Sequence, residues 1–145
     1  LIKYGVMDDP EGGLTLDEGL ETAQRIVAAG VDAIEVSSGV GTSTRTLKKG
    51  DPERAYFRDR AAAVKRAVRV PIIAVAGIRS LDLAEDIIRS GDADLVSMCR
   101  PLIREPGLPS RWESGDTRPS TCISCNGCLA MARRTVPLRC VQPPD

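Results

Sequence analysis

The sequence predicts an α/β fold built on a parallel sheet. Short apolar segments alternate with amphipathic helical patterns over about the first 100 residues, as in a parallel barrel or a doubly wound sheet. The apolar segments are nearly continuous, which is typical of parallel strands covered on both faces. The segments AQRIVAAGVDAIEV and AEDIIRSGDADLVSM share one order of helix, glycine, aspartate and strand. This echo indicates a repeated βα unit, and four such units are half of an eight-stranded barrel.

Four strands and three helices are expected in this part of the chain. The first helix follows a capping box formed by Thr15 and Glu18, in which each side chain caps the backbone of the other residue. Its apolar stripe continues through Leu20, Ala23 and Val27. The apolar segments that predict the strands are Leu1–Val6, Ala33–Val36, Pro71–Val75 and Leu95–Met98.

The second and third helices are predicted from their apolar faces and caps. Residues Glu53 to Val68 form one helical pattern, with an inward face that includes Ala61 and Val64. Ser80 is the expected N-cap of the next helix. That helix is expected to turn Leu81, Ala84 and Ile88 towards the sheet.

Composition excludes several functional classes. The 20 basic and 20 acidic residues balance, so neither a nucleic-acid partner nor an anionic membrane surface is indicated. No apolar segment is long enough to span a membrane and no signal peptide is visible, so a cytoplasmic location with reduced thiols is expected. Histidine, the commonest acid–base group near neutral pH, is absent from the chain.

Two regions are expected, and the chain is interpreted as part of a longer polypeptide. Residues 1–110 would form half of a barrel, and residues 111–145 a cysteine-rich segment. The first residue is leucine within an apparent strand, and the last residues add no closing element. We therefore expect a missing N-terminal half of the barrel, and a homo-oligomer is one further possibility.

Two loops after consecutive strands indicate a phosphate-binding site. The third strand runs into Ala76-Gly77-Ile78, and the fourth into Cys99-Arg100. In parallel barrels the carboxyl ends of the last strands commonly bind phosphate. Gly77 permits a close backbone approach to an anion, and the Arg100 guanidinium matches phosphate geometry. The alternative is a turn glycine and a surface arginine.

Lys3 and the loop Ser37–Thr44 are further candidates at the same rim. A lysine between apolar neighbours in a strand must reach a strand end or meet a partner. It would stabilise an anion in the mouth of a barrel, or only extend from a frayed strand into water. The loop Ser37–Thr44 is polar and glycine-rich, and it either contacts substrate or only connects two elements.

Four cysteines near the C-terminus form a C-x2-C-x2-C-x11-C array. Three thiols in a short loop and a fourth further along suit a [4Fe–4S] cluster. Zinc sites more often pair two C-x2-C knuckles, so zinc is the second interpretation and unliganded cysteines are the third. Arg133, Arg134 and Arg139 would offset the charge of the thiolates. The array consists of Cys122, Cys125, Cys128 and Cys140, and Cys99 is excluded from it.

The ordered motifs resemble those of the NADH:flavin oxidoreductase family, which is related to old yellow enzyme. The motifs are LIKYGVMDDPEGGLTLDE, AGVDAIEVSSG, VPIIAVAGIRS, GDADLVSMCRPLIREP, and CISCNGCL followed by LRC. The similarity covers essentially the whole chain. It is greatest to the iron–sulfur branch, with 2,4-dienoyl-CoA reductase and trimethylamine dehydrogenase. It implies the C-terminal half of a (β/α)8 TIM barrel that binds FMN, followed by a Cys-rich C-terminal tail.

The resemblance also implies roles for individual residues. Lys3 would lie near the pyrimidine edge of FMN and stabilise negative charge on the reduced flavin. Ala76, Gly77 and Ile78 would form the first phosphate loop. Cys99 and Arg100 would form the second, with Arg100 clamping the phosphate. The array cysteines Cys122, Cys125, Cys128 and Cys140 would be the cluster ligands.

Two departures from the family pattern affect the phosphate loops. Ala76 replaces the first glycine of a common Gly-Gly pair, and Cys99 stands where glycine is frequent. The substrate-polarising and acid residues of the family lie in the earlier half, so no catalytic residue is expected in this chain, which should be inactive alone.

The resulting prediction is an FMN-dependent oxidoreductase that uses NAD(P)H to reduce a small-molecule substrate such as an activated alkene. A flavin-free phosphate-binding isomerase or aldolase barrel is the first alternative. A zinc-stapled, non-enzymatic module is the second.

Overall fold

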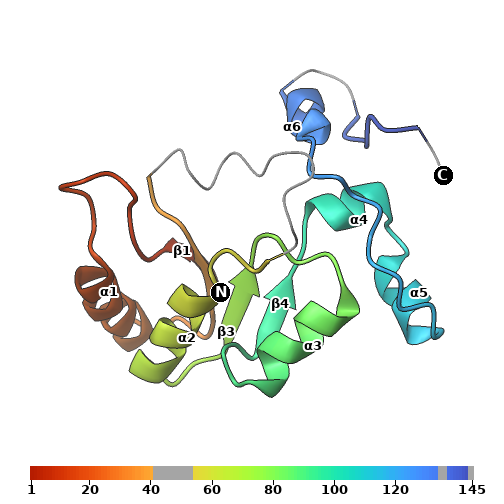
Figure 1. Cartoon of the computed structure of the whole chain (residues 1–145). Coiled ribbons are helices and arrows are strands. Elements are labelled where there is room, and N and C mark those ends of the chain that lie inside the picture. The colour runs from red at the N-terminus through yellow and green to blue at the C-terminus, as the bar shows by residue number, and fades with distance from the viewer. Residues whose placement is uncertain (41–53, 134–136, 144–145) are drawn as a thin grey trace.

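The chain forms a four-stranded parallel sheet with helices packed along one face (Figure 1). The structure, a computed structural model, describes residues 1–40, 54–133 and 137–143. Adjacent strands in the sequence are neighbours in the sheet, in the order β1-β2-β3-β4. All three pairings are parallel, so the predicted α/β class is confirmed. The strands are β1 (Ile2–Gly5), β2 (Ile34–Ser37), β3 (Ile72–Val75) and β4 (Leu95–Ser97).

A helix follows each strand, and two further helices lie in the C-terminal segment. Helices α1 to α3 connect the strands, and α4 to α6 follow the sheet. None of the described helices has the length and apolar character needed to cross a lipid bilayer. The helices are α1 (Leu16–Ala28), α2 (Arg58–Ala67), α3 (Leu81–Arg89), α4 (Arg100–Arg104), α5 (Leu108–Glu113) and α6 (Gly127–Ala132).

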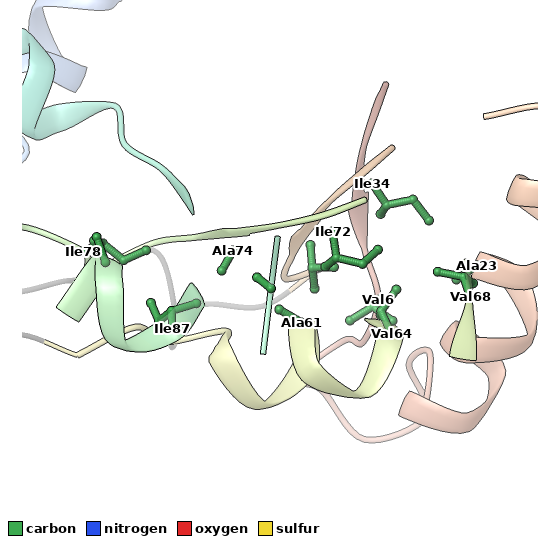
Figure 2. Packing of buried hydrophobic residues seen from close by; sticks show 13 residues of the cluster. Val6, Ala23, Ile34, Ala61, Val64, Val68, Ile72, Ala74, Ile78 and Ile87 are labelled. Carbon is green, nitrogen blue, oxygen red and sulfur yellow. The ribbon is translucent and has the colours of Figure 1, made fainter. Parts of the chain in front are cut away.

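The hydrophobic core lies between the sheet and these connecting helices. Figure 2 shows Ile34, Ile72 and Ala74 of the strands facing Ala61 and Val64 of α2. All five side chains are fully buried. Burial of a large aliphatic side chain contributes about 1.5–3 kcal/mol, so this contact layer holds the helices on the sheet.

The local signals for the helices are largely confirmed. Thr15 and Glu18 form the predicted capping box at α1, and Ser80 caps α3 by accepting a bond from the Leu83 amide. Helix α2 begins at Arg58, later than predicted, because Ala55–Phe57 turn instead; Glu53 lies outside the described residues.

One inward residue of α3 was predicted wrongly. Ile87 is fully buried, whereas Ile88 is 40% exposed. Both isoleucines fit an apolar stripe at helical spacing, and the angle at which α3 packs on the sheet selects Ile87. This angle depends on the neighbouring strands and is not encoded in the helix alone.

The second face of the sheet is not covered by the described helices. Burial alternates along β2 and β3, with one residue buried and the next only partly buried. Leu95 of β4 is 50% exposed. The sequence predicted strands covered on both faces, and within the described residues only one face is covered. Lys3, Glu35 and Ser97 emerge on the second face.

Candidate functional site

A hollow of about 170 Å³ opens at the carboxyl ends of β3 and β4. Its walls combine the predicted first loop, Ala76-Gly77-Ile78, with residues Ser97–Pro101 of the second. Parallel pairing of Val75 with Ser97 places both strand ends at one edge of the sheet. The structure therefore brings together the five residues predicted for the two phosphate loops.

The first loop has a backbone shape that only some residues tolerate. Ala76 and Gly77 both have positive φ angles, 78° and 84°. The Ala76 carbonyl accepts a bond of 3.1 Å from the Tyr56 amide, which draws residues 54–56 against the loop. A Cβ atom on Gly77 would lie 1.9 Å from the Arg54 carbonyl oxygen. Gly77 is therefore required by its backbone angle and by this close approach.

The second loop connects the hollow to the cysteine segment. Cys99 is exposed and Arg100 begins α4. The Arg100 guanidinium donates a bond of 2.7 Å to the Asn126 side-chain oxygen. Arg100 and Asn126 also line a second, mostly apolar hollow of about 330 Å³ that is bordered by Cys128 and Leu129. Arg100 thus lies between the predicted phosphate site and the cysteine loop.

Lys3 meets a charged partner on the open face of the sheet. It lies on β1 in register with Glu35 of β2, and the two side chains form an ion pair. The second Glu35 oxygen accepts a bond of 2.7 Å from the Ser97 hydroxyl. Burial acts to raise the pKa of Glu35, but hydrogen bonds from Lys3 and Ser97 and the charge of Lys3 outweigh it and lower the pKa.

The first three array cysteines lie on one loop that bends around the middle thiol. Ser124 and Asn126, on either side of Cys125, have positive φ angles of 55° and 59°. Cys122 is buried and Cys125 exposed, while Cys128 lies near the start of α6. Burial is the main cause that raises the pKa of Cys128.

The segment that carries the fourth cysteine approaches this loop through the side chain of Val141. A Cβ atom on Gly127 would lie 2.1 Å from a methyl carbon of Val141, the neighbour of Cys140. Glycine at position 127 therefore lets the last segment lie against the loop. Within the ranges that the structure describes, no three thiols, carboxylates or imidazoles are arranged to hold a metal ion. The donor set fits a thiolate-bound cluster in its chemistry, and closure around one would require the thiols to converge further.

Glu105 fastens the cysteine segment to the sheet domain. One oxygen accepts bonds from the Thr121 amide (2.7 Å) and the Ser120 hydroxyl (3.0 Å), and the other pairs with Arg111 at 2.8 Å. Burial acts to raise the pKa of Glu105, but these bonds outweigh it and lower the pKa.

The loop after β3 makes a second attachment. The Arg79 carbonyl accepts a bond of 2.8 Å from the Ser120 amide. The Arg79 guanidinium donates one of 3.2 Å to the Cys122 carbonyl. The segment that precedes the first array cysteine is thus tied to Arg79, the residue directly after the predicted first phosphate loop.

Glu35 and Glu105 are the residues that sequence reasoning missed. Glu35 had a detectable signal, because it is the single carboxylate within the apolar segment AIEVS. Glu105 had none, because its partners are 6 to 16 residues away in an irregular segment. The loop Ser37–Thr44 is described only to Val40, and Arg134 also lies outside the described residues.

The fold and this hollow together define one class of protein. A four-stranded parallel sheet with helices on one face and a hollow at the carboxyl ends of its strands is consistent with part of a (β/α) barrel, the fold in which that edge carries the active site. The profile of the NADH:flavin oxidoreductase / NADH oxidase family matches residues 15–118. The chain belongs to this family, and the resemblance inferred from the motifs is confirmed.

Known relatives are considerably longer than this chain. It is 37% identical over 138 residues to an NADH oxidase of Thermoanaerobacter brockii, covering 92% of this chain and 21% of the relative. It is 35% identical to a metal reductase of Desulforamulus reducens, covering 97% and 21%. The chain therefore spans about a fifth of the length of these relatives.

Two solved structures share the fold. A 2-naphthoyl-CoA reductase, in complex with 2-naphthoyl-CoA, superposes with a TM-score of 0.67 at 28% identity, covering 87% of this chain and 19% of that one. A 6-hydroxypseudooxynicotine amine oxidase of Pseudomonas geniculata N1 superposes with a TM-score of 0.72 at 26% identity, covering 98% and 21%. These similarities support the assignment of the sheet to part of a larger TIM-barrel flavoenzyme fold.

Proposed function

We propose that this chain forms the FMN-binding part of an NAD(P)H-dependent oxidoreductase. The observation that carries the proposal is the hollow between two strand ends, in a chain of a flavin oxidoreductase family. Bound FMN would supply hydride transfer from NAD(P)H to a small-molecule substrate, such as an activated alkene. The relatives named as reductases and oxidases support this reaction class. We propose that the other half of the barrel is supplied by the rest of a longer polypeptide.

The residues of the two loops would bind the phosphate of FMN. Ala76, Gly77 and Ile78 would present their backbone to it, because the positive φ angles of Ala76 and Gly77 turn the chain sharply at the edge of the hollow. Cys99 would border the phosphate, and Arg100 would pair with it. Arg100 donates to Asn126, so phosphate binding would add to or replace that bond. Lys3, on the open sheet face, would lie beside the flavin ring.

Flavin binding by a protein that carries the complete barrel tests this proposal. Arg100→Ala removes a charge-assisted hydrogen bond of about 1.5–3 kcal/mol and should weaken FMN binding about 10- to 100-fold. The matched control is Arg89→Ala, because Arg89 is exposed on α3 and pairs only with Glu85 among the described contacts. A colourless protein that binds phosphate esters instead would favour the flavin-free isomerase or aldolase.

We further propose that the cysteine array binds a [4Fe–4S] cluster. Cys122, Cys125, Cys128 and Cys140 supply four thiolates, the ligand number of such a cluster. The contact of Gly127 with Val141 supports the proposal, since it places the Cys140 segment against the loop of the other three. The cluster would exchange single electrons with a partner.

Metal analysis separates this proposal from its alternatives. Iron and acid-labile sulfide at about four atoms each per protein are expected, and Cys125→Ser should abolish both. Cys99→Ser, which changes the exposed cysteine outside the array, should leave the iron content unchanged. Zinc without sulfide would favour the zinc-stapled module instead. A cytoplasmic location and a homo-oligomeric state stay predictions.

A further inference from the structure

We propose that Glu35 is a positioning residue that holds Lys3 beside the flavin and balances its positive charge. The inference rests on the proposed function, because it concerns the same flavin site. It assigns a role to a residue that the sequence motifs left without one. Its basis is the arrangement of Lys3, Glu35 and Ser97 on the open face of the sheet.

The three residues come from three different strands. Lys3 and Glu35 are register partners on β1 and β2, whereas Ser97 reaches Glu35 from β4, across β3. Each carboxylate oxygen has one partner: Oε1 pairs with the Lys3 ammonium and Oε2 accepts from the Ser97 hydroxyl at 2.7 Å. Glu35 is therefore restrained at both oxygens.

The surroundings favour this restraint, chiefly on the side of Glu35. The residues beside Glu35 on the next two strands are apolar. Glu35 is in register with Ile73 of β3, and Ile73 is in register with Leu95 of β4. The Glu35 side chain is only 19% exposed, compared with 57% for Lys3. A lysine side chain has a flexible four-carbon stem, and without a partner its ammonium group would sample many positions. The carboxylate at its side limits these positions and keeps the ammonium on the open face.

The pair also sets the charge that a flavin would experience. With both residues ionised, the net charge of the pair is zero. Removing the carboxylate charge leaves the ammonium uncompensated, and a positive charge favours the more negative, reduced form of a nearby flavin. Loss of the Glu35 charge should therefore raise the flavin midpoint potential.

The test is the midpoint potential of the FMN-loaded protein with Glu35→Gln. We expect the ratio of reduced to oxidised flavin at a fixed potential to rise about tenfold, which equals about 30 mV for a two-electron couple. Glu21→Gln is the matched control, because it removes the charge of an ion-paired glutamate on the outer surface of α1. It should leave the potential unchanged.

A double variant distinguishes charge balance from a purely structural role. Lys3→Gln combined with Glu35→Gln removes both charges and leaves an uncharged polar side chain at each position. It should return the potential towards the wild-type value, and it remains informative if the single Glu35 variant does not fold. Normal flavin binding with an unchanged potential in Glu35→Gln, or a double variant whose potential stays raised, would overturn this inference alone. A protein that binds no flavin would overturn the proposed function as well.

Discussion

Gly77→Ala is the most direct perturbation of the candidate phosphate site. The substitution adds a single carbon atom at a position where φ is 84°. That atom would lie 1.9 Å from the Arg54 carbonyl oxygen and 2.5 Å from the ring of Tyr56. Both the backbone angle and the contact with neighbouring atoms therefore oppose any side chain here.

The expected cost has two parts. A left-handed backbone angle costs a residue other than glycine about 1–2 kcal/mol. Overpacking against neighbouring atoms typically costs a further 1–3 kcal/mol, because the Arg54 segment must move. The free energy of unfolding should therefore fall by about 2–5 kcal/mol. FMN binding should also weaken, since the added methyl group displaces the loop that lines the hollow.

A matched glycine separates the two parts. Gly30 has a φ of 96°, but a Cβ atom added there meets nothing within 4 Å. Gly30→Ala should therefore cost only the backbone part, about 1–2 kcal/mol, and should not affect FMN binding. Urea unfolding followed by circular dichroism measures the stabilities, and flavin fluorescence measures binding. Equal losses of stability in the two variants, or unchanged FMN affinity in Gly77→Ala, would refute the steric argument.

Two further predictions concern the neighbouring loop and the cysteine segment. Ala76→Gly should stabilise the protein by about 1 kcal/mol, because glycine adopts the φ of 78° without the strain that alanine has there. Unfolding in urea measures the gain in stability, and a loss of stability would contradict backbone strain at Ala76. Glu105→Gln should loosen residues 120–122, measured as faster hydrogen exchange of the Thr121 amide, whereas Glu113→Gln on the exposed side of α5 should not. Because the folded pKa of Glu105 is lowered, its contribution is present above the ordinary pKa near 4.5 and is lost as the pH falls further. A protection factor of the Thr121 amide that stays unchanged in acid would rule out this role.

Much of the fold was predictable because its signals are local. The capping box of Thr15 and Glu18 requires residues three apart, and the strands were predicted from apolar segments of four to six residues. The proximity of the two loops proposed to bind phosphate was predictable for a related reason. Parallel strands bring their carboxyl ends to one edge, so residues directly after β3 and β4 must lie close together.

Other features depended on contacts between distant segments. The choice of Ile87 over Ile88 as the buried residue of α3 depends on how the helix packs. The attachment of the cysteine segment depends on Glu105, whose partners lie in irregular chain. Because Glu105 belongs to no recognisable motif, the sequence alone does not indicate this attachment.

The sequence by itself determined the α/β class, the family and the two loops that meet at the carboxyl ends of β3 and β4. These follow from short-range patterns and ordered motifs, which do not require knowledge of distant contacts. The tertiary structure alone decided that Lys3 pairs with Glu35 and that Arg100 reaches Asn126. Those contacts join residues 32 and 26 positions apart, and only strand register and loop packing bring them within hydrogen-bonding distance.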